Sequence, residues 1–547
     1  MIDKIYFLLE QAWNKYKEIN HLGNISSLEF TVEYPKSVKF GDFSSNIAMR
    51  LAPIAKQNPM SIATELRMYI EDDCFEKIEI VPPGFINFFV KADFLAEEVN
   101  EIILAKNNYG KNNSGQNKKI QVEFISANPT GPLTVGNGRG AFTGNCLINV
   151  FNFSGYKAKS EYLINDRGKQ IDTLGESVIR RYLQEQGVKI DYPEDLYRGD
   201  YIKDLAKKIK LKDFKLSNAS EIKKVREEIK EWALSQMIEN IKRVVEEKCQ
   251  VKFDKWFSEK SLYEGKLKEN IWKFLEENNL IYKNENAWWF RSTLYKDDKD
   301  RVIVKKEGDP TYFFSDILYL HNRLKLRKFD KVLMIWGCDH HGDVPRVMAA
   351  SKALGFDGRV DIILYQLVRL MLNGKEIRMS KRKGNFVTLE ELVDEVGIDV
   401  VRWFFLMYEI NSHMDFDLNL AKKKSEQNPV YYCQYAHARI CSILAKIPKT
   451  KTPAPDKLEY SNSAEFALIK QLAQFPDVVK EVGETYATHK LPQYAMDLAR
   501  KFHKFYADCR VMSNDEVNMP RLYLVKATKI VMANALKLMG ISAPEKM

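Results

Sequence analysis

The sequence predicts an α/β protein: a core built on a parallel sheet and split by a helical insertion, with a small α+β module before it and an all-helical module after it. Three observations lead to this fold class. Residues 120–164 show a strand–helix–strand pattern, which is typical of a parallel sheet with a right-handed crossover. A heavily charged stretch with helical periodicity follows at about 175–290, and from residue 389 onward the pattern is almost wholly helical. The 547 residues also exceed what one hydrophobic core organises.

The first module is expected to span residues 1–105. We predict helices at 2–19, 44–54 and 60–70 and an extended segment at 28–35. Two short apolar runs flank Pro82-Pro83-Gly84, which is a hairpin signature. Residues 106–119, KNNYGKNNSGQNKK, are polar, rich in Gly and Asn and without periodicity, and therefore predict a linker.

The core is expected to span residues 120–388. Its first strands are predicted at 120–126 and 157–164, with a helix between them. The sheet pattern then resumes in three apolar runs, at 311–320, 331–336 and 361–372. The insertion at about 175–290 should pack through an apolar stripe on one helical face, which consists of Ile222, Val225, Ile229, Trp232, Ala233, Met237, Ile241 and Val244.

The last part of the chain is predicted to be helical throughout. A connecting region at 389–425 should lead into an all-helical module at 426–547. Only the loop PKTKTPAPDK, residues 448–457, interrupts the helical pattern of that module.

Composition indicates ordinary globular domains, with 45% hydrophobic and 12% aromatic residues. No apolar run approaches the roughly 20 residues that span a bilayer. The N-terminus alternates charged and apolar residues and lacks a cleavage site, so we do not expect a signal peptide. Seven cysteines without a CxxC pair indicate a reducing compartment, so we expect a cytoplasmic protein. The net charge of +10 fits either a lysine-rich proteome or a polyanionic partner, and charge alone does not decide between them.

The stretch GPLTVGNGRGAF, Gly131–Phe142, places several glycines at a predicted helix start, where phosphate groups commonly bind. A Walker A loop would need a lysine followed by Ser or Thr, and this run carries Arg139 instead. A dinucleotide fingerprint is matched by Gly136, Gly138 and Ala141. However, its first glycine should follow the strand directly, and nine residues, ANPTGPLTV, intervene here. Both interpretations are therefore disfavoured.

The same turn resembles the first signature of the class I aminoacyl-tRNA synthetases. In that signature two polar side chains three residues apart donate hydrogen bonds to ATP phosphates at a helix N-terminus. Thr134 and Asn137 occupy these two positions. RMSKRKGN, Arg378–Asn385, resembles the second signature, a mobile loop in which Ser380 and Lys381 would neutralise the leaving pyrophosphate. Both signatures occur in the expected order, on either side of the insertion, which a chance match does not explain.

Longer segments narrow the resemblance to the bacterial arginyl-tRNA synthetases. They run through the whole chain: GDFSSNIAMRLA, VEFISANPTGPL, INDRGKQI, YFFSD, WGCDHHGDVPR, QLVRL, NPVYYCQYAHAR and LMGISAPEKM. The resemblance implies a Rossmann-like catalytic domain, an N-terminal domain that contacts tRNA and a helical anticodon-binding domain. It implies ligation of L-arginine to tRNA(Arg) through an arginyl-adenylate, with ATP and Mg²⁺ and without a structural metal. We also expect a monomer and no membrane association.

The resemblance further implies roles for individual residues. The implied catalytic residues are Thr134, Asn137, Arg378, Ser380 and Lys381. The implied ATP contacts are Pro129, Gly131, Thr134, Gly136, Asn137, Gly337, Asp339, Met379 and Lys381. The implied arginine contacts are Glu123, Ser126, Asn128, Tyr312, Asp316 and His340. An active-site loop would contain Asn165, Asp166, Gly168 and Gln170, and tRNA would contact Tyr431, Tyr435, His437 and Arg439.

The chemistry of the substrate agrees with the acidic pair. A guanidinium offers five donors in a planar fork, which carboxylates accept in bidentate fashion. Glu123 and Asp316 are the expected acceptors, and such a site would reject lysine because lysine leaves buried acceptors unpaired. Singly, each acid has an ordinary structural explanation, and it is their shared placement within the family's motifs that favours the functional one.

Several departures leave alternatives open. Histidine is usual at the position of Thr134 and commonly also at that of Asn137, and Arg378 stands where lysine is usual. A catalytically inactive, tRNA-binding paralogue is therefore the alternative function. Another class I synthetase is disfavoured, because the acidic pair suits a cationic side chain. His340 and His341 lack an evident third ligand, so no metal site is expected.

Overall fold

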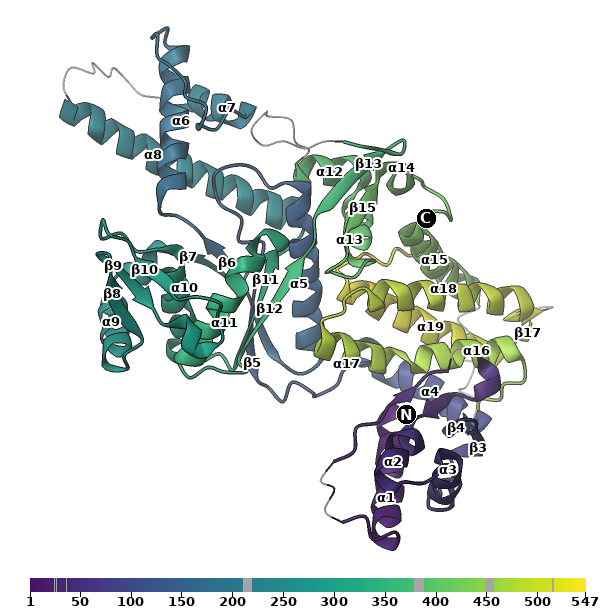
Figure 1. Cartoon of the computed structure of the whole chain (residues 1–547). Helices are drawn as coiled ribbons and strands as arrows, with labels where there is room; N and C mark the ends of the chain where they lie inside the picture. The colour runs from purple at the N-terminus through teal and green to yellow at the C-terminus, as the bar shows by residue number, and fades with distance from the viewer. Residues whose placement is uncertain are drawn as a thin grey trace.

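The computed structural model describes the chain except for residues 24, 26, 36, 210–218, 378–387, 448–456 and 514–515, and except for the side chains of residues 38 and 219–224. Figure 1 shows three parts: a sheet-based core with a projecting helical arm, a helical part beside it, and a small N-terminal part packed against those helices. Within the described residues, no helix is both long and apolar enough to cross a membrane.

The core is a five-stranded parallel sheet, as the sequence predicts. Its order is β12 (Val360–Tyr365), β11 (Lys331–Gly337), β5 (Lys119–Phe124), β6 (Lys157–Ile164) and β7 (Lys255–Ser258). The sequence order reverses between β5 and β11, and open α/β sheets bind their ligands at the carboxyl ends of the strands at such a point. The fold therefore directs attention to the segments that follow these two strands.

Both faces of this sheet are covered. Successive side chains of β11 point to opposite sides of the sheet, and each set is buried in a different apolar cluster. Leu333 and Ile335 belong to the apolar cluster that includes α5 (Val135–Phe153). Val332 and Met334 belong to the cluster that includes α10 (Tyr312–His321) and α11 (Val344–Ala353). Figure 1 shows α5 on one side of the strands and α10 and α11 on the other. This two-sided burial explains why the strand KVLMIW is a continuous apolar run.

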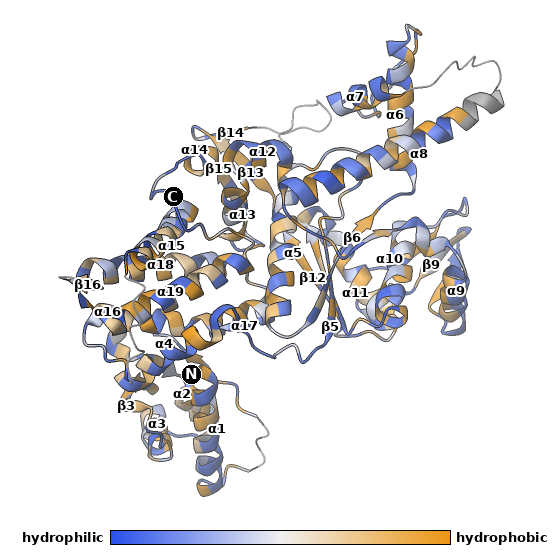
Figure 2. Cartoon of the chain, turned by 180° about the vertical axis from the view of Figure 1, so that it is seen from behind, coloured by the Kyte–Doolittle hydropathy of each residue, from blue (hydrophilic) through white to orange (hydrophobic). Residues whose placement is uncertain are grey.

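The insertion begins with three helices, α6 (Lys169–Glu185), α7 (Asp200–Lys208) and α8 (Ala219–Arg243). The predicted stripe on α8 is confirmed for its described side chains: Val225, Ile229, Ala233 and Met237 are buried against α6 and α7, Trp232 is partly buried there, and Ile241 and Val244 join the core. The side chain of Ile222 lies outside the described residues. Figure 2 shows hydrophilic and hydrophobic residues alternating along α8, as expected of a helix with one apolar face.

Beyond the π-helical turn η3 (Val244–Lys248), the expectation of helix up to residue 290 is wrong. β7 joins the central sheet, and a three-stranded antiparallel sheet follows, formed by β8 (Ile281–Asn284), β9 (Ala287–Phe290) and β10 (Arg301–Val304), with helices η4 (Lys260–Tyr263), α9 (Leu267–Glu277) and η5 (Ser292–Tyr295). Strands of four residues are too short to show a period. The hairpin turn at Glu285 and Asn286 uses positive φ angles of 49° and 60° without any glycine to signal it.

Residues 311–320 are a second correction, because the structure forms helix α10 where the sequence suggests a strand. The run YFFSDILYL is apolar with only two polar residues, and periodicity does not separate a fully buried helix from a buried strand. α10 continues into the π-helical turn η6 (Asn322–Leu326). Both elements contribute side chains to the site described below.

The N-terminal part is a four-stranded antiparallel sheet with helices on it. Its strands and helices are β1 (Val32–Glu33), β2 (Phe43–Ser45), β3 (Phe75–Val81), β4 (Phe85–Val90), α1 (Ile2–Ile19), α2 (Ile47–Ala55), α3 (Pro59–Met68) and α4 (Ala92–Ala105), with turns η1 (Val38–Phe40) and η2 (Lys106–Asn108). The predicted first helix and the hairpin are confirmed. α2 begins later than predicted, because residues 43–45 pair with β4 instead. The predicted linker runs along the end of α5, where Gly115 N donates to Ser154 O at 2.8 Å.

The remaining chain is mainly helical, as predicted. Its helices are α12 (Leu389–Val396), α13 (Ile398–Leu406), α14 (Leu418–Ala421), α15 (Pro429–Lys446), α16 (Ser463–Ala473), α17 (Phe475–Thr485), α18 (Lys490–Asp508) and α19 (Met519–Leu538). β13 (Val368–Leu372), which lies in the predicted apolar run 361–372, pairs with two strands that the sequence did not indicate, β14 (Lys375–Glu376) and β15 (Met414–Asp417). β16 (Met512–Ser513) pairs with β17 (Glu516–Val517). In Figure 1, α4 lies against α16 and α19.

Candidate functional site

The chain turns sharply where β5 ends, at the carboxyl edge of the sheet. Ile125 and Ser126 have φ angles of 68° and 36°, a region that a β-branched residue such as isoleucine rarely occupies. The neighbouring strand holds this turn: Leu163 N donates to Ser126 Oγ at 3.1 Å and Tyr162 OH donates to Ala127 O at 2.9 Å. Strain of this kind persists where the surroundings enforce it, and it clusters at functional sites.

The glycine-rich turn that follows leads into the N-terminus of α5, which Thr134 caps. Asn137 Oδ1 accepts from Thr134 N at 2.9 Å and from Thr134 Oγ1 at 3.0 Å. The predicted pair is therefore brought together, but the two side chains bind each other. The Thr134 hydroxyl is engaged within the cap, and the amide NH₂ of Asn137, which also bonds to Tyr365, keeps one N–H as the donor that remains.

The surroundings of this turn leave one face open. A Cβ on Gly136 would meet only Thr134 Oγ1, at 3.7 Å. Tyr365, at the end of β12, lies beside Asn137: burial raises the pKa of Tyr365 to about 12, and a hydrogen bond with Asn137 acts in the opposite direction. An open glycine face at a helix N-terminus is a suitable approach for phosphate oxygens.

Arg139 is the basic residue of this stretch, and it does not face the opening. It is fully buried, and its guanidinium donates to the carbonyls of Gln366, Glu409 and Ser412. Burial lowers the pKa of Arg139 to about 10. Arg139 therefore anchors α5 to the loops around β13 and β15.

The second signature falls within residues 378–387, so Arg378, Met379, Ser380 and Lys381 lie outside the described residues. The segment that follows it contacts the first signature directly. Leu389 N donates to Leu133 O at 2.9 Å, and Thr134 and Thr388 form an isolated β-bridge. The described chain therefore resumes, after the second signature, directly beside the first one.

The predicted residues after β11 lie at the same edge of the sheet. Asp339 and His340 are exposed, and His340 Nδ1 lies 2.9 Å from Asp343 Oδ2. A Cβ on Gly337 would come within 2.4 Å of Asp339 Oδ1, so a larger residue there would displace the exposed carboxylate of Asp339. Its polar side chains thus face solvent at the switch point of the sheet.

Asp316 is the most unusual acid of the site. It lies on α10, one turn after the half-exposed Tyr312, and makes no hydrogen bond or ion pair with any other residue that the structure describes. Burial raises the pKa of Asp316 to about 7, although Arg346 acts to lower it. A partly buried carboxylate without a protein partner is suited to receive a cation.

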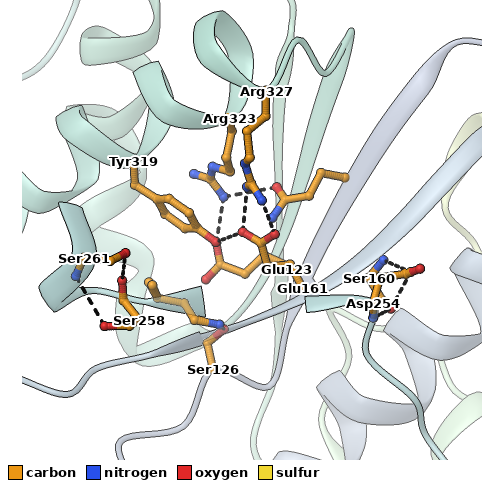
Figure 3. A network of polar contacts seen from close by, with 12 residues as sticks. Glu123, Ser126, Ser160, Glu161, Asp254, Ser258, Ser261, Tyr319, Arg323 and Arg327 are labelled. Atoms are coloured by element: carbon orange, nitrogen blue, oxygen red, sulfur yellow. Dashed lines mark hydrogen bonds and ion pairs between the residues drawn. The ribbon is translucent and has the colours of Figure 1, made fainter. Parts of the chain in front are cut away.

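Glu123, the other expected acceptor, already has a partner. Its Oε2 lies 2.7 Å from Nη1 of Arg323, and both side chains are almost fully buried. Burial raises the pKa of Glu123, and the charge of Arg323 opposes this. Figure 3 shows this pair beside a second one, between Glu161 and Arg327. Sequence reasoning missed Arg323, because a basic residue at the end of an apolar helix gives no sign of its partner.

Glu259 is a third acid that sequence reasoning missed. It follows β7 directly, is only 2% exposed, and accepts a hydrogen bond from Ser315 Oγ at 2.7 Å. Its Oε2 has no partner among the described residues, and burial raises its pKa. Burial and the charge of Glu259 also raise the pKa of Tyr312, which puts the two within electrostatic reach. A lone acid at a strand end was the available signal, but β7 itself was not recognised.

The predicted active-site loop links these parts. Asn165 Nδ2 donates to Asn128 Oδ1 at 2.9 Å, which joins the loop to the chain after β5. Asp166 Oδ1 accepts from Lys260 N at 2.9 Å. Gly168 has a φ of 90°, and a Cβ there would lie 3.3 Å from Tyr312 OH. Gln170 lines a cavity of about 750 Å³ together with Gly131, next to Pro129.

In the helical part, only half of the predicted tRNA contacts come together. Tyr435 and Arg439 line a groove of about 820 Å³ with Tyr506, and the Arg439 guanidinium lies 4.9 Å from the centre of each tyrosine ring. His437 is buried instead, with Nδ1 2.9 Å from Pro544 O, and Tyr431 does not line this groove. Within the described residues, no group of three or more His, Cys, Asp and Glu side chains is placed to hold a metal ion.

Comparison with known proteins agrees with this arrangement. Residues 98–413 match the family described as tRNA synthetases class I (R), catalytic domain; residues 8–90 match the arginyl tRNA synthetase N terminal domain, and residues 433–547 match the DALR anticodon binding domain. The chain is 44% identical over 528 residues to an arginine–tRNA ligase of Carboxydothermus hydrogenoformans, which covers 95% of this chain and 94% of the relative. It is 41% identical over 550 residues to an arginine–tRNA ligase of Dehalococcoides mccartyi, with 98% of each chain covered.

The fold itself matches a solved structure. Thermus thermophilus arginyl-tRNA synthetase superposes with a TM-score of 0.76 over the full length of both chains, at 19% identity. The α/β core, the N-terminal antiparallel sheet and the helical C-terminal part are thus the fold of that protein. Together with the near-complete coverage of the relatives, this establishes that the chain belongs to the arginyl-tRNA synthetase family.

Proposed function

We propose that the chain is an arginine–tRNA ligase, which activates L-arginine with ATP and transfers it to the 2′-hydroxyl of the terminal adenosine of tRNA(Arg). The observation that carries the proposal is Asp316, a partly buried carboxyl group whose pKa burial raises to about 7 and whose side chain has no protein partner among the described residues. It lies on α10, above a sheet whose carboxyl edge is the usual ligand site of this fold. The names of the relatives support the same reaction.

For arginine, we assign Asp316 and Glu259 as the main acceptors of the substrate guanidinium. Oε2 of Glu259 has no partner among the described residues, and Tyr312 lies within its electrostatic reach and one helical turn before Asp316. Lysine would fill only part of such a site, which leaves buried acceptors unpaired. We assign Ser126, on the strained turn, and Asn128, just after it, to contacts with the backbone of the amino acid.

For ATP, which enters as its Mg²⁺ complex, we assign the phosphates to the N-terminus of α5. Asn137 and the first backbone N–H groups of the helix supply donors, and Gly136 leaves room for the phosphates. We assign Asp339, exposed after β11, to the ribose. Catalysis then consists of positioning and neutralisation of charge, with no side-chain nucleophile, and Lys381 would act on the pyrophosphate.

For tRNA, we assign the groove of Tyr435, Arg439 and Tyr506 to an unpaired base, because aromatic rings and a guanidinium plane are platforms for stacking. Because aminoacyl-tRNA is consumed in translation, we place the protein in the cytoplasm. We propose that it acts as a monomer, which gel filtration coupled to light scattering tests.

The test of the function is arginine-dependent exchange of pyrophosphate into ATP, measured with and without tRNA(Arg). We expect exchange with arginine, stimulation by tRNA, and no exchange with lysine. A chain that binds tRNA but supports neither exchange nor arginylation would be the inactive paralogue instead.

A further inference from the structure

Helix α10 and the π-helical turn after it carry a stripe of polar side chains that leads from the site into the protein. Its members recur every third or fourth residue: Tyr312, Asp316, Tyr319, Arg323 and Arg327. Tyr312 is half-exposed, whereas Tyr319 and Arg323 are 2% and 1% exposed. The stripe therefore connects Asp316 at the site to a buried arginine beneath it.

Arg323 is held firmly. Its guanidinium pairs with Glu123 at 2.7 Å, lies 3.8 Å from the centre of the Tyr319 ring, and reaches Gln121 Oε1 at 3.4 Å. Glu123 in turn lies within electrostatic reach of Asp316. A buried carboxylate without its cation would take up a proton, because burial disfavours the charged form.

A second pair provides an internal comparison. Arg327 binds Glu161 through both carboxylate oxygens, and Tyr319 also donates to Glu161. Glu123 and Glu161 are directly opposite each other on the neighbouring strands β5 and β6. Figure 3 shows Arg323 and Arg327 side by side, with their guanidinium groups directed toward Glu123 and Glu161. The two charge pairs match in chemistry, but it is Glu123 and Arg323 that act on Asp316: Glu123 raises its pKa, and Arg323 lowers it to a smaller extent.

We propose that Arg323 is a positioning residue for arginine recognition: it keeps Glu123 ionised and fixed in orientation, so that Glu123 adds its negative charge to those of Asp316 and Glu259. This inference rests on the proposed function. Arg323, a buried residue of the protein, thus sets the charge of the site that binds the substrate arginine. Arg323 itself does not touch the substrate.

The test compares Arg323→Gln with Arg327→Gln, which breaks the equivalent pair four residues further on. Both variants should lose thermal stability, since each leaves a buried carboxylate unpaired. Arg323→Gln should also raise the KM for arginine by about ten-fold or more, with the KM for ATP unchanged. This KM should fall again at high pH, as Glu123 ionises. Arg327→Gln should keep the wild-type KM and pH profile, and Arg323→Lys should recover part of the loss.

A double variant covers the case in which Arg323→Gln does not fold. Glu123→Gln/Arg323→Gln removes both charges and leaves no unpaired ion. We expect it to fold and to keep a raised KM for arginine, whose remaining fall through about pH 7 then reflects the ionisation of Asp316 alone. A wild-type KM in this double variant, or equal arginine kinetics in Arg323→Gln and Arg327→Gln, overturns the inference.

Calorimetric binding of arginine to the wild-type chain separates the two proposals. If the wild type binds arginine, the dissociation constants of the variants test the inference even in the absence of turnover. If the wild type neither binds nor activates arginine, the proposed function is wrong, and the inference falls with it.

Discussion

At the N-terminal end of α5, one amide group performs two tasks. The oxygen of Asn137 accepts both hydrogen bonds from Thr134, which completes the helix cap. One N–H of its NH₂ group remains for a ligand. This division explains how the turn can bind phosphates without histidine at either position.

We therefore expect the two positions to differ in mutation. Asn137→Ala removes the free donor and the cap acceptor, and should lower kcat for pyrophosphate exchange by about 10²-fold. Thr134→Val keeps the backbone bond to Asn137 and should cost much less activity, with Thr134→Ser as the control that retains the hydroxyl. Equal losses in Asn137→Ala and Thr134→Val would show that the hydroxyl itself binds ATP.

Asp316 predicts a dependence of stability on pH. Because burial raises the pKa of this carboxyl to about 7, the folded chain keeps a proton that the unfolded chain releases above about pH 4. The contribution of Asp316 to stability therefore falls as the pH rises from about 4 to about 7. Asp316→Asn should raise Tm by a few degrees at about pH 8 and leave it unchanged at about pH 4, which differential scanning calorimetry measures.

The same group predicts the opposite trend for the substrate. Arginine binds the ionised carboxylate, so its KM should fall as the pH rises through about 7, and bound arginine should stabilise the wild type more than Asp316→Asn. If the arginine kinetics of Asp316→Asn match those of the wild type, Asp316 does not belong to the site.

At the scale of elements, the contact between α5 and β5 positions the ATP turn. Gly144 lies against Phe124, where a Cβ would come within 2.2 Å of the ring, and Phe124 is fully buried. Phe124 has no space to move away, so alanine at this position must displace the helix from the strand.

Two glycine variants on the same helix should therefore separate stability from binding. Gly144→Ala should destabilise the fold by about 1–3 kcal/mol through overpacking, measured by chemical unfolding. Gly136→Ala meets no close neighbour and should keep or slightly raise stability, while it raises the KM for ATP. A stable Gly144→Ala protein with wild-type activity would contradict the packing argument.

Elements with strong local signals were predictable from the sequence. The first helix, the hairpin at Gly84, the strand 157–164 and the stripe on α8 follow from periodicity and turn residues. β7 and the small antiparallel sheet were not predictable, because strands of four residues show no period. α10 was mistaken for a strand because its burial on nearly all sides removes the helical period.

Only those site residues that lie within recognisable motifs were predictable from the sequence. Thr134, Asn137 and Asp316 lie in recognisable segments, and the structure places them at the sheet edge. Glu259 and Arg323 have no local signature; their significance arises from long-range packing between β7, β5 and α10. The burial of His437 likewise depends on the last residues of the chain, which a helical pattern does not reveal.

At the scale of the whole molecule, substitutions in the helical part can test tRNA binding separately from the activation of arginine. Arg439 lies between two tyrosines on the groove, and Arg439→Gln should weaken tRNA binding and reduce the slope of log K against log salt by about 0.7 if it contacts a single-stranded phosphate. Arg500→Gln removes the same charge from an exposed residue outside the groove and is the matched control. Filter binding over a salt series compares the two variants. Equal effects would show that Arg439 contributes to tRNA binding only through its charge.

The two ends of the chain are also joined to each other. Tyr34 OH donates to Asp477 at 2.5 Å, and Lys480 pairs with Asp3 at 2.8 Å. The two partners of each pair are more than 400 positions apart in the sequence. Such contacts close only when the whole chain is present.

The docking of α4 on α16 and α19 has a consequence for synthesis on the ribosome. Leu95, Val99 and Ile102 of α4 are buried, and the helices that cover this side of the molecule come from the last hundred residues or so of the chain. At roughly 5–20 residues per second, these helices emerge tens of seconds after α4. The nascent N-terminal module therefore presents a bare apolar face during this interval, which is the kind of surface that chaperones bind while the rest of the protein is being made.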